Sequence, residues 1–352
     1  MLTFSTRLVV FVTSCALLNC SFVSSQTKEN ETEEFSARDK AIFVEILKSA
    51  EEGDAAAQCE LAYCYGNGIV VSKSSDKAFE WYKKSADQGY TESIYELAYC
   101  YECGLGTVKD IEKAFGLYKK AAEQGDDPAQ FYLAHCYADG IGVEQNLEES
   151  FKWYIKSAEQ GNGISQFLVG NKYEQGEGVE LNQKEAFKWY QRSAEQKFQP
   201  AQRDLAWCYE AGIGVEKNSK KAFELYKEYS MQGNVIAQWD LGRCYDNGIG
   251  TEKDSVKALE WYKKSTAKSD AAAKYSVGSY FFNQGRLAEA REFFEEAATQ
   301  GSSEAQDMLD KYYKEQNNEQ TKSSMNNDEK SNASNSTNKE DSSWWKKICS
   351  YF

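Results

Sequence analysis

Large apolar and aromatic residues return along this chain at a fixed interval, with small and charged residues between them. Glycines and tyrosines mark the interval most clearly, because each series advances by 36 residues (104 − 68 = 36). The two series are Gly68, Gly104, Gly140, Gly176, Gly212 and Gly248, and Tyr65, Tyr101, Tyr137, Tyr173, Tyr209 and Tyr245. A period of this size predicts an array of helix pairs, in which each pair buries its apolar face against its neighbours.

Each repeat unit contains two amphipathic stretches that predict two short helices. The first stretch carries a large apolar residue, a small one, and a tyrosine four positions after the large one, as in Leu97, Ala98 and Tyr101. This spacing places the aliphatic side chain and the ring on one helix face. A Gly-x-Gly pair then ends the helix, because glycine tolerates positive φ. The second stretch begins at an Asp, Asn or Ser and carries an aromatic pair such as Trp153-Tyr154.

The pattern divides the chain into an array and flanking segments. The seven expected units, the last of them shortened, span 54–89, 90–125, 126–161, 162–197, 198–233, 234–269 and 270–301. Half units flank the array and predict an N-terminal capping helix at 37–53 and a C-terminal capping helix at 302–316. Polar composition predicts a flexible lead-in at 26–36 and a disordered linker at 317–343, followed by an aromatic-basic tail, WWKKICSYF, at 344–352.

The slot pattern large-small-x-x-Tyr, Gly-x-Gly-Val and Lys-Ala-x-x-Trp-Tyr-x-Lys-Ala-Ala-Glu-Gln-Gly resembles the Sel-one-like repeat family, a relative of the tetratricopeptide repeats. The resemblance covers about 54–301. It implies an all-α fold, a right-handed α-solenoid of stacked antiparallel helix pairs, and a non-catalytic adaptor that binds other proteins on a concave surface. Departures at Val70, Lys197 and Ser269, which replace glycines of the pattern, leave the local loop geometry open.

In related tetratricopeptide arrays the first helix lines the concave groove. The position two before the repeat tyrosine, here called the variable slot, is therefore our candidate for partner binding, with residues Tyr63, Tyr99, His135, Asn171, Trp207 and Arg243. Aromatic and arginine side chains are typical anchors of binding hot spots. Their mixed chemistry favours an extended segment of a partner protein, contacted at several points. The slot four residues earlier is expected to pack between repeats, with Tyr95, Phe131, Phe167, Arg203 and Trp239.

The first 25 residues differ from the rest and predict a secretory signal peptide. Arg7 precedes an apolar run at 8–18, and small residues lead to a cleavage site near Ser25. We therefore expect a secreted or exported protein, in a periplasm, an extracellular space or a secretory-pathway lumen. Cys20 ends a sequence similar to a bacterial lipoprotein box and is a candidate for lipidation. In a eukaryotic secretory pathway the candidates for glycosylation are Asn30, Asn332 and Asn335.

Ten cysteines would suggest disulfides in a secreted chain, but their positions favour another interpretation. Five occupy one slot of the repeat, immediately before the shared tyrosine: Cys64, Cys100, Cys136, Cys208 and Cys244. Equivalent slots of neighbouring repeats lie on the order of 10 Å apart, which is beyond the reach of a disulfide. We expect unpaired thiols packed between helices.

Neither catalysis nor nucleic-acid binding finds support in the sequence. The net charge of −14 argues against nucleic acid as a partner. His135 is the one histidine and has no nucleophile attached, and Cys100 with Cys103 supplies only half a zinc site. We expect no catalytic residue, metal or cofactor. The enzyme alternative, β-lactam binding or hydrolysis, comes from cysteine-rich members of the family. Those members carry a disulfide pair in every repeat, and here Ser74 and Lys77 form Ser-x-x-Lys without its companion motifs.

The tail supports a second alternative, a host-interacting effector with weak membrane contact. The residues that suggest it are Trp344, Trp345, Lys346 and Lys347, which have the amphipathic character of an interfacial anchor. Cys349 begins a four-residue terminus with the length of a prenylation box. A tail that folds back on the array is the remaining interpretation.

Overall fold

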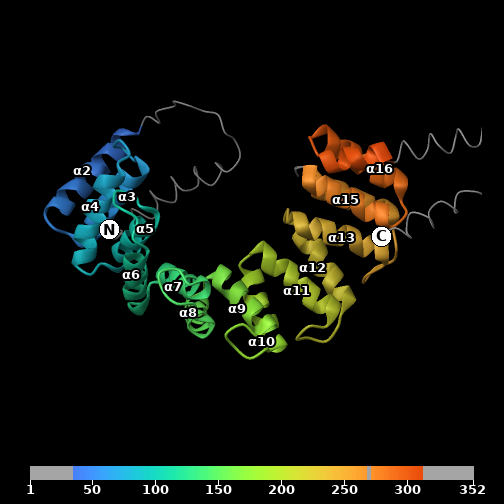
Figure 1. The fold of residues 1–352 in the computed structure, drawn as a ribbon, viewed down its shortest axis with the longest axis horizontal. Coiled ribbons are helices and arrows are strands. Elements are labelled where there is room, and N and C mark those ends of the chain that lie inside the picture. The colour runs from blue at the N-terminus through green and yellow to red at the C-terminus, as the bar shows by residue number, and fades with distance from the viewer. Residues whose placement is uncertain (1–34, 268–270, 312–352) are drawn as a thin grey trace, which may run out of the picture. The chain divides into compact units, whose positions relative to one another are not determined.

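The computed structural model describes residues 35–267 and 271–311 of the chain, and within these ranges it has helices and no β-strand (Figure 1). The chain divides into two compact units, and the division falls between Leu117 and Tyr118, inside one helix. Each unit is described by itself. This all-α array of helix pairs with a 36-residue period is an α-solenoid, as the sequence predicts.

The first unit begins with a single helix and continues with helix pairs. Successive helices pack on one another from α2 to α5. The helices are α2 (Ala37–Glu51), α3 (Ala55–Asn67), α4 (Ser75–Asp87), α5 (Thr91–Cys103) and α6 (Ile111–Glu123), the last of which contains the division.

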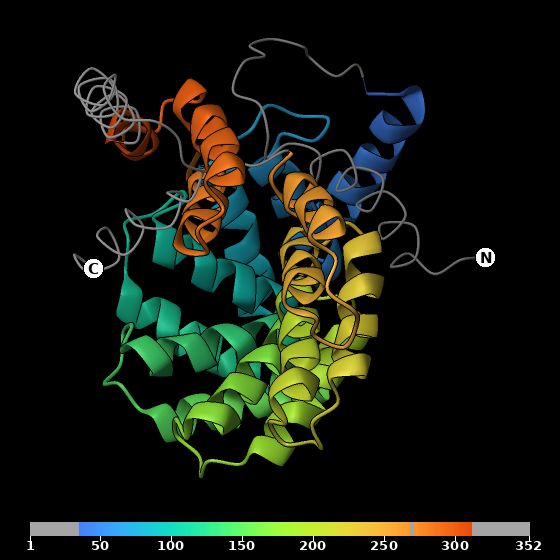
Figure 2. The same ribbon diagram turned by 90° about the vertical axis from the view of Figure 1, so that its right-hand side faces the viewer.

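The second unit contains the remaining helices, which follow one another in chain order (Figures 1 and 2). They are α7 (Asp127–Asp139), α8 (Leu147–Glu159), α9 (Gly163–Gln175), α10 (Gln183–Glu195), α11 (Gln199–Ala211), α12 (Ser219–Met231), α13 (Val235–Asn247), α14 (Ser255–Thr266), α15 (Ala271–Asn283) and α16 (Leu287–Thr299). Residues 303–311 are also helical. Each helix packs on the next, so that the array grows by one pair per repeat.

The glycine after each first helix stops it by adopting the left-handed conformation. At Gly140 φ is 72°, and its amide donates to the carbonyl of Cys136. Six residues after Gly140, the amide of Asn146 donates to the carbonyl of Tyr137 at 2.8 Å, and the Asn146 side chain caps α8 by accepting from the amide of Glu149. The tyrosine series therefore marks the point where each loop is tied back to the helix that precedes it.

The second glycine of the loop lies against the backbone of the preceding repeat. A Cβ atom on Gly178 would lie 2.1 Å from the carbonyl oxygen of Leu147. The positions where the sequence departs from glycine keep the same backbone, since Val70 has φ of 65° and Lys197 has φ of 64°. Val70 packs against a core cluster that includes Phe43 of α2. Ser269 lies outside the described residues.

Buried tyrosines of the second helices fill the core, and the small slot of the first helix makes room for them. A Cβ atom on Gly170 would lie 2.6 Å from the ring of the fully buried Tyr190. The cysteines of the repeat slot are buried, and none of them forms a disulfide within the described residues. Burial raises the pKa of Cys100, Cys208 and Cys244 to about 12, so these thiols stay protonated at neutral pH. The expectation that these side chains pack between helices is confirmed for the slot.

Candidate protein-binding face

Residues of the variable slot lie on the first helix of each pair, on a side that we call the first-helix face. In the first unit Tyr99 of α5 is 38% exposed and Tyr63 of α3 is half-buried. In the second unit Trp207 of α11 is 44% exposed. His135 of α7 and Asn171 of α9 are half-buried. This face presents aromatic side chains to solvent in both units.

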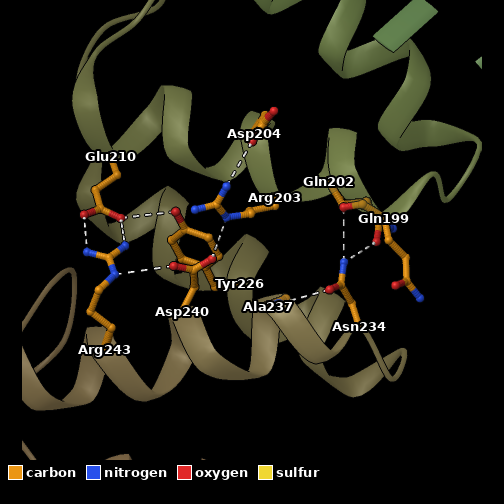
Figure 3. Close-up of polar contacts among 10 residues, drawn as sticks. All are labelled: Gln199, Gln202, Arg203, Asp204, Glu210, Tyr226, Asn234, Ala237, Asp240 and Arg243. Carbon is orange, nitrogen blue, oxygen red and sulfur yellow. Dashed lines mark hydrogen bonds and ion pairs between the residues drawn. The ribbon is translucent and has the colours of Figure 1, made fainter. Parts of the chain in front are cut away.

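Arg243, the last residue of the variable slot, is held by carboxylates of the same unit. Its two terminal nitrogens donate to the carboxylate oxygens of Glu210 at 2.8 and 2.6 Å, and its Nε lies 3.4 Å from Asp240 (Figure 3). The Arg243 side chain is only 17% exposed as a result. A paired guanidinium in this fork geometry is both strongly bonded and fixed in orientation.

A second arginine completes this network on α11. The Arg203 Nε donates to Asp240 at 3.3 Å, and its Nη1 lies 3.7 Å from the carboxylate of Asp204 (Figure 3). Burial, followed by repulsion from Glu174 and Asp240, raises the pKa of Asp204 to about 6, although Arg203 opposes the shift. The first-helix face of the second unit is therefore rich in carboxylates that arginines only partly neutralise.

The other residues of the slot make polar contacts within their own repeat. The Tyr190 hydroxyl lies 2.6 Å from the Asn171 Oδ1 and 2.5 Å from Glu174. The His135 Nδ1 lies 3.1 Å from Asp139, four residues later on the same helix. Neither contact assembles a nucleophile with a base.

The slot four residues earlier packs between helices where it is aromatic. Phe167 contacts the rings of Tyr190 and Phe198 at 5.8 and 5.4 Å, and Trp239 contacts the ring of Tyr280 at 5.7 Å. Phe198 and Tyr280 belong to the following repeats, which agrees with the expectation of packing. Arg203 differs from these aromatic residues, since its side chain is 49% exposed.

The motifs weighed for catalysis and metal binding have structural roles or lie apart. The Ser74 hydroxyl accepts from the amide of Lys77 and caps α4. Cys100 is buried, whereas Cys103 is exposed at the end of the same helix. Among the described residues no group of three or more His, Cys, Asp or Glu side chains could hold a metal ion. None of the described helices is long and apolar enough to cross a membrane.

Several predicted features lie outside the described residues and stay predictions. They are the segments 1–25, 317–343 and 344–352, and the residues Cys20, Asn30, Asn332, Asn335, Trp344, Trp345, Lys346, Lys347 and Cys349.

The sequence profile of the Sel1 repeat matches seven consecutive segments of the chain. Each segment starts one residue after the start of the corresponding expected unit: 55–90, 91–126, 127–162, 163–198, 199–234, 235–270 and 271–302. The chain belongs to the Sel1 repeat family. The resemblance stated from the sequence is thus confirmed, and repeats of this kind serve as scaffolds for protein–protein interaction. No curated protein sequence matches the chain.

Two solved structures show the same fold at or above 30% identity. One is a protective antigen of uropathogenic Escherichia coli with an SLR fold, at 33% identity and a TM-score of 0.66 over 75% of this chain. This Sel1 repeat chain spans only 57% of the length of that antigen. The other is a Sel1 repeat protein from Oxalobacter formigenes, at 30% identity and a TM-score of 0.54, which aligns with 65% of this chain and 97% of its own.

The sequence identified the variable slot but missed the carboxylates that surround it. Glu174 and Glu210 occupy one repeat position, and Asp204 and Asp240 occupy another, each pair 36 residues apart (210 − 174 = 36). That shared spacing was the available signal. This signal is weak, because charged residues at helical spacing usually indicate no more than a solvated face.

Proposed function

We propose that this Sel1 repeat protein is an exported, non-catalytic adaptor whose first-helix face binds an extended segment of a partner protein, as the family resemblance implies for the concave groove. The observation that carries the proposal is Trp207, a large aromatic side chain left 44% exposed in a slot whose neighbours are buried. Tyr99 repeats the feature in the first unit. Exposed aromatic side chains between polar groups are typical of binding hot spots.

The test compares Trp207→Ala with a matched control in the full chain. Val256 on α14 is 72% exposed and lies outside the variable slot, so Val256→Ala removes a similar exposed apolar side chain elsewhere. Each protein is crosslinked in its native cells, and the co-purified proteins are quantified by mass spectrometry. We expect a partner whose recovery falls about tenfold with Trp207→Ala, equivalent to about 1.4 kcal/mol, and is unchanged with Val256→Ala. Equal recovery with both variants would contradict the proposal.

A truncation separates the array from the tail. Retention of the same partner by a chain without 344–352 supports recognition on the first-helix face. Loss of the partner would move recognition to the tail and contradict the proposed site. Export rests on the segment 1–25, and sequencing the N-terminus of the mature protein tests it, with cleavage near Ser25 as the expected result.

A further inference from the structure

Two neighbouring steps of the second unit carry nearly the same polar constellation. Three residue types recur 36 positions apart (226 − 190 = 36), and the fourth position, the variable slot, changes from tryptophan to arginine. The equivalent pairs are Tyr190 and Tyr226, Glu174 and Glu210, Asp204 and Asp240, and Trp207 and Arg243. The later step therefore shows what the carboxylates of the earlier step are placed to bind.

In the later step the chain supplies its own cation. Glu210 accepts two hydrogen bonds from Arg243, at 2.8 and 2.6 Å, and a third from the Tyr226 hydroxyl at 3.2 Å (Figure 3). Asp240 lies 3.4 Å from the Arg243 Nε on the other side. The guanidinium carbon lies 6.0 Å from the centre of the Trp207 ring. Two carboxylates, a tyrosine hydroxyl and an indole thus surround one guanidinium.

In the earlier step the equivalent carboxylates are Glu174 and Asp204, and Trp207 holds the repeat position that Arg243 holds in the later step. Glu174 accepts from the Tyr190 hydroxyl, as Glu210 does from Tyr226. Asp204 lies 3.7 Å from Arg203, whose Nε donates to Asp240 of the later step. Repulsion from Glu174 contributes to the raised pKa of Asp204, which indicates that the two carboxylates act on each other. Negative charge here is less well compensated than at Arg243.

We propose that Glu174, Asp204 and Trp207 bind an arginine or lysine side chain from the extended segment of the partner. This inference rests on the proposed function and names the chemistry of the segment. The two half-buried carboxylates would pair with the cation, and the indole would contact its face or its aliphatic stem. Arginine is favoured over lysine because the equivalent carboxylates already bind a guanidinium through two parallel hydrogen bonds.

The first test fills the site from within the chain. In Trp207→Arg the new guanidinium should meet Glu174 and Asp204 as Arg243 meets Glu210 and Asp240. We expect the pKa of the Asp204 carboxyl, followed by NMR, to fall below about 6 in Trp207→Arg and to stay raised in Trp207→Ala. An Asp204 pKa that is the same in both variants would show that a cation in this slot does not reach the carboxylates, and would overturn the proposal.

The second test measures binding with a defined probe. The probe is a fluorescent peptide of about twelve glycine and serine residues with arginines at every third position, and its control carries neutral citrulline instead. We expect the full chain to bind the arginine peptide at least about tenfold more tightly than the citrulline peptide. Glu174→Gln, Asp204→Asn and Trp207→Arg should each abolish that preference, while Val256→Ala should keep it. Far-ultraviolet circular dichroism confirms that each variant is folded.

The outcomes separate this inference from the function on which it rests. Equal affinity for the arginine and citrulline peptides overturns the inference, even if the native partner is still lost with Trp207→Ala, in which case the proposed function stands. If Trp207→Ala still binds both the native partner and the arginine peptide, the inference and the proposed function are both overturned. If removal of 344–352 raises the affinity for the arginine peptide about tenfold, the occupant of the site is the chain's own tail, and a partner side chain is excluded.

Discussion

Single residues decide how closely successive repeats approach, and Gly214 shows this most directly. Its φ of 68° lies in the left-handed region, and a Cβ atom there would lie 2.0 Å from the carbonyl oxygen of Gln183 in the preceding repeat. Gly233, which follows α12 and its C-cap residue Gln232, has φ of 87° but nothing within 4 Å of its Cβ position. The two glycines share the same conformational constraint, and only Gly214 adds a close contact between repeats.

We expect Gly214→Ala to destabilise the protein far more than Gly233→Ala. The control variant should lose about 1 kcal/mol of unfolding free energy from the left-handed backbone. Gly214→Ala should lose about 3 kcal/mol or more, because the backbone of two repeats must also separate. Urea denaturation followed by circular dichroism measures both. Equal losses would show that the contact with Gln183 carries no weight.

Glu60, a half-buried residue of α3, predicts a dependence of stability on pH. Burial, with repulsion from Glu92 and Asp54, raises the pKa of Glu60 from 4.5 to about 7. The folded chain therefore binds this proton more tightly than the unfolded chain, so the stabilisation is complete below pH 4.5 and is lost as the pH rises to about 7. Glu60→Gln should remove about 1 kcal/mol of this dependence, a value reduced for solvent screening. Curves of unfolding free energy against pH that run parallel for the two proteins would contradict this prediction.

At the scale of helices, buried glutamines join each pair to the next. The Gln166 side chain on α9 donates to the carbonyl of Ala158 at the end of α8, at 3.1 Å. It also accepts from the Gln196 side chain, which follows α10, at 2.8 Å. One amide thus connects three consecutive helices. Gln130 repeats the arrangement one step earlier, so the bond is a regular part of the array.

Replacing this amide should loosen the junction between helix pairs. Gln166→Leu keeps the side-chain volume but removes the acceptor of the Gln196 amide and one donor to the Ala158 carbonyl, which still accepts from the amide of Gly161. We expect a loss of about 1–3 kcal/mol of unfolding free energy. Gln191→Leu on α10 is the control, since that glutamine is exposed, and it should change stability by less than about 0.5 kcal/mol. Thermal and urea unfolding of the two variants decide the matter, and a harmless Gln166→Leu would refute the role of the bond.

At the scale of the whole molecule, the sequence predicts the features that recur in every repeat. It does not predict the contacts that differ from one repeat to the next. The 36-residue period was sufficient for helix pairs, small slots and capping residues, because each repeat solves the same packing problem. The period does not predict whether a slot residue is exposed or held in an ion pair. Arg243 is neutralised by Glu210, which precedes it by 33 residues. The local sequence of α13 does not indicate that this residue is its partner.

Buried Lys172 in the thiol slot makes the same point. Its ammonium lies 3.5 Å from Glu177 and 5.5 Å from the centre of the Tyr154 ring. A residue that looks like an exception in the pattern is accommodated by a side chain of its own loop and one of the preceding helix pair. Sequence position defines such a slot, but the side chains that meet in it come from neighbouring elements and are settled only by the packing.

The buried thiols make the survival of the folded array depend on how fast it unfolds. Cys136, Cys208 and Cys244 are shielded in the folded chain, and unfolding returns each of them to water and to its ordinary reactivity. An oxidant or alkylating agent then captures the opened chain covalently before it can refold. Where this capture is faster than reclosing, the protein is lost at the rate at which its repeats open, whatever its equilibrium constant. The fourth repeat has Lys172 in this slot, so its opening exposes no thiol there for capture.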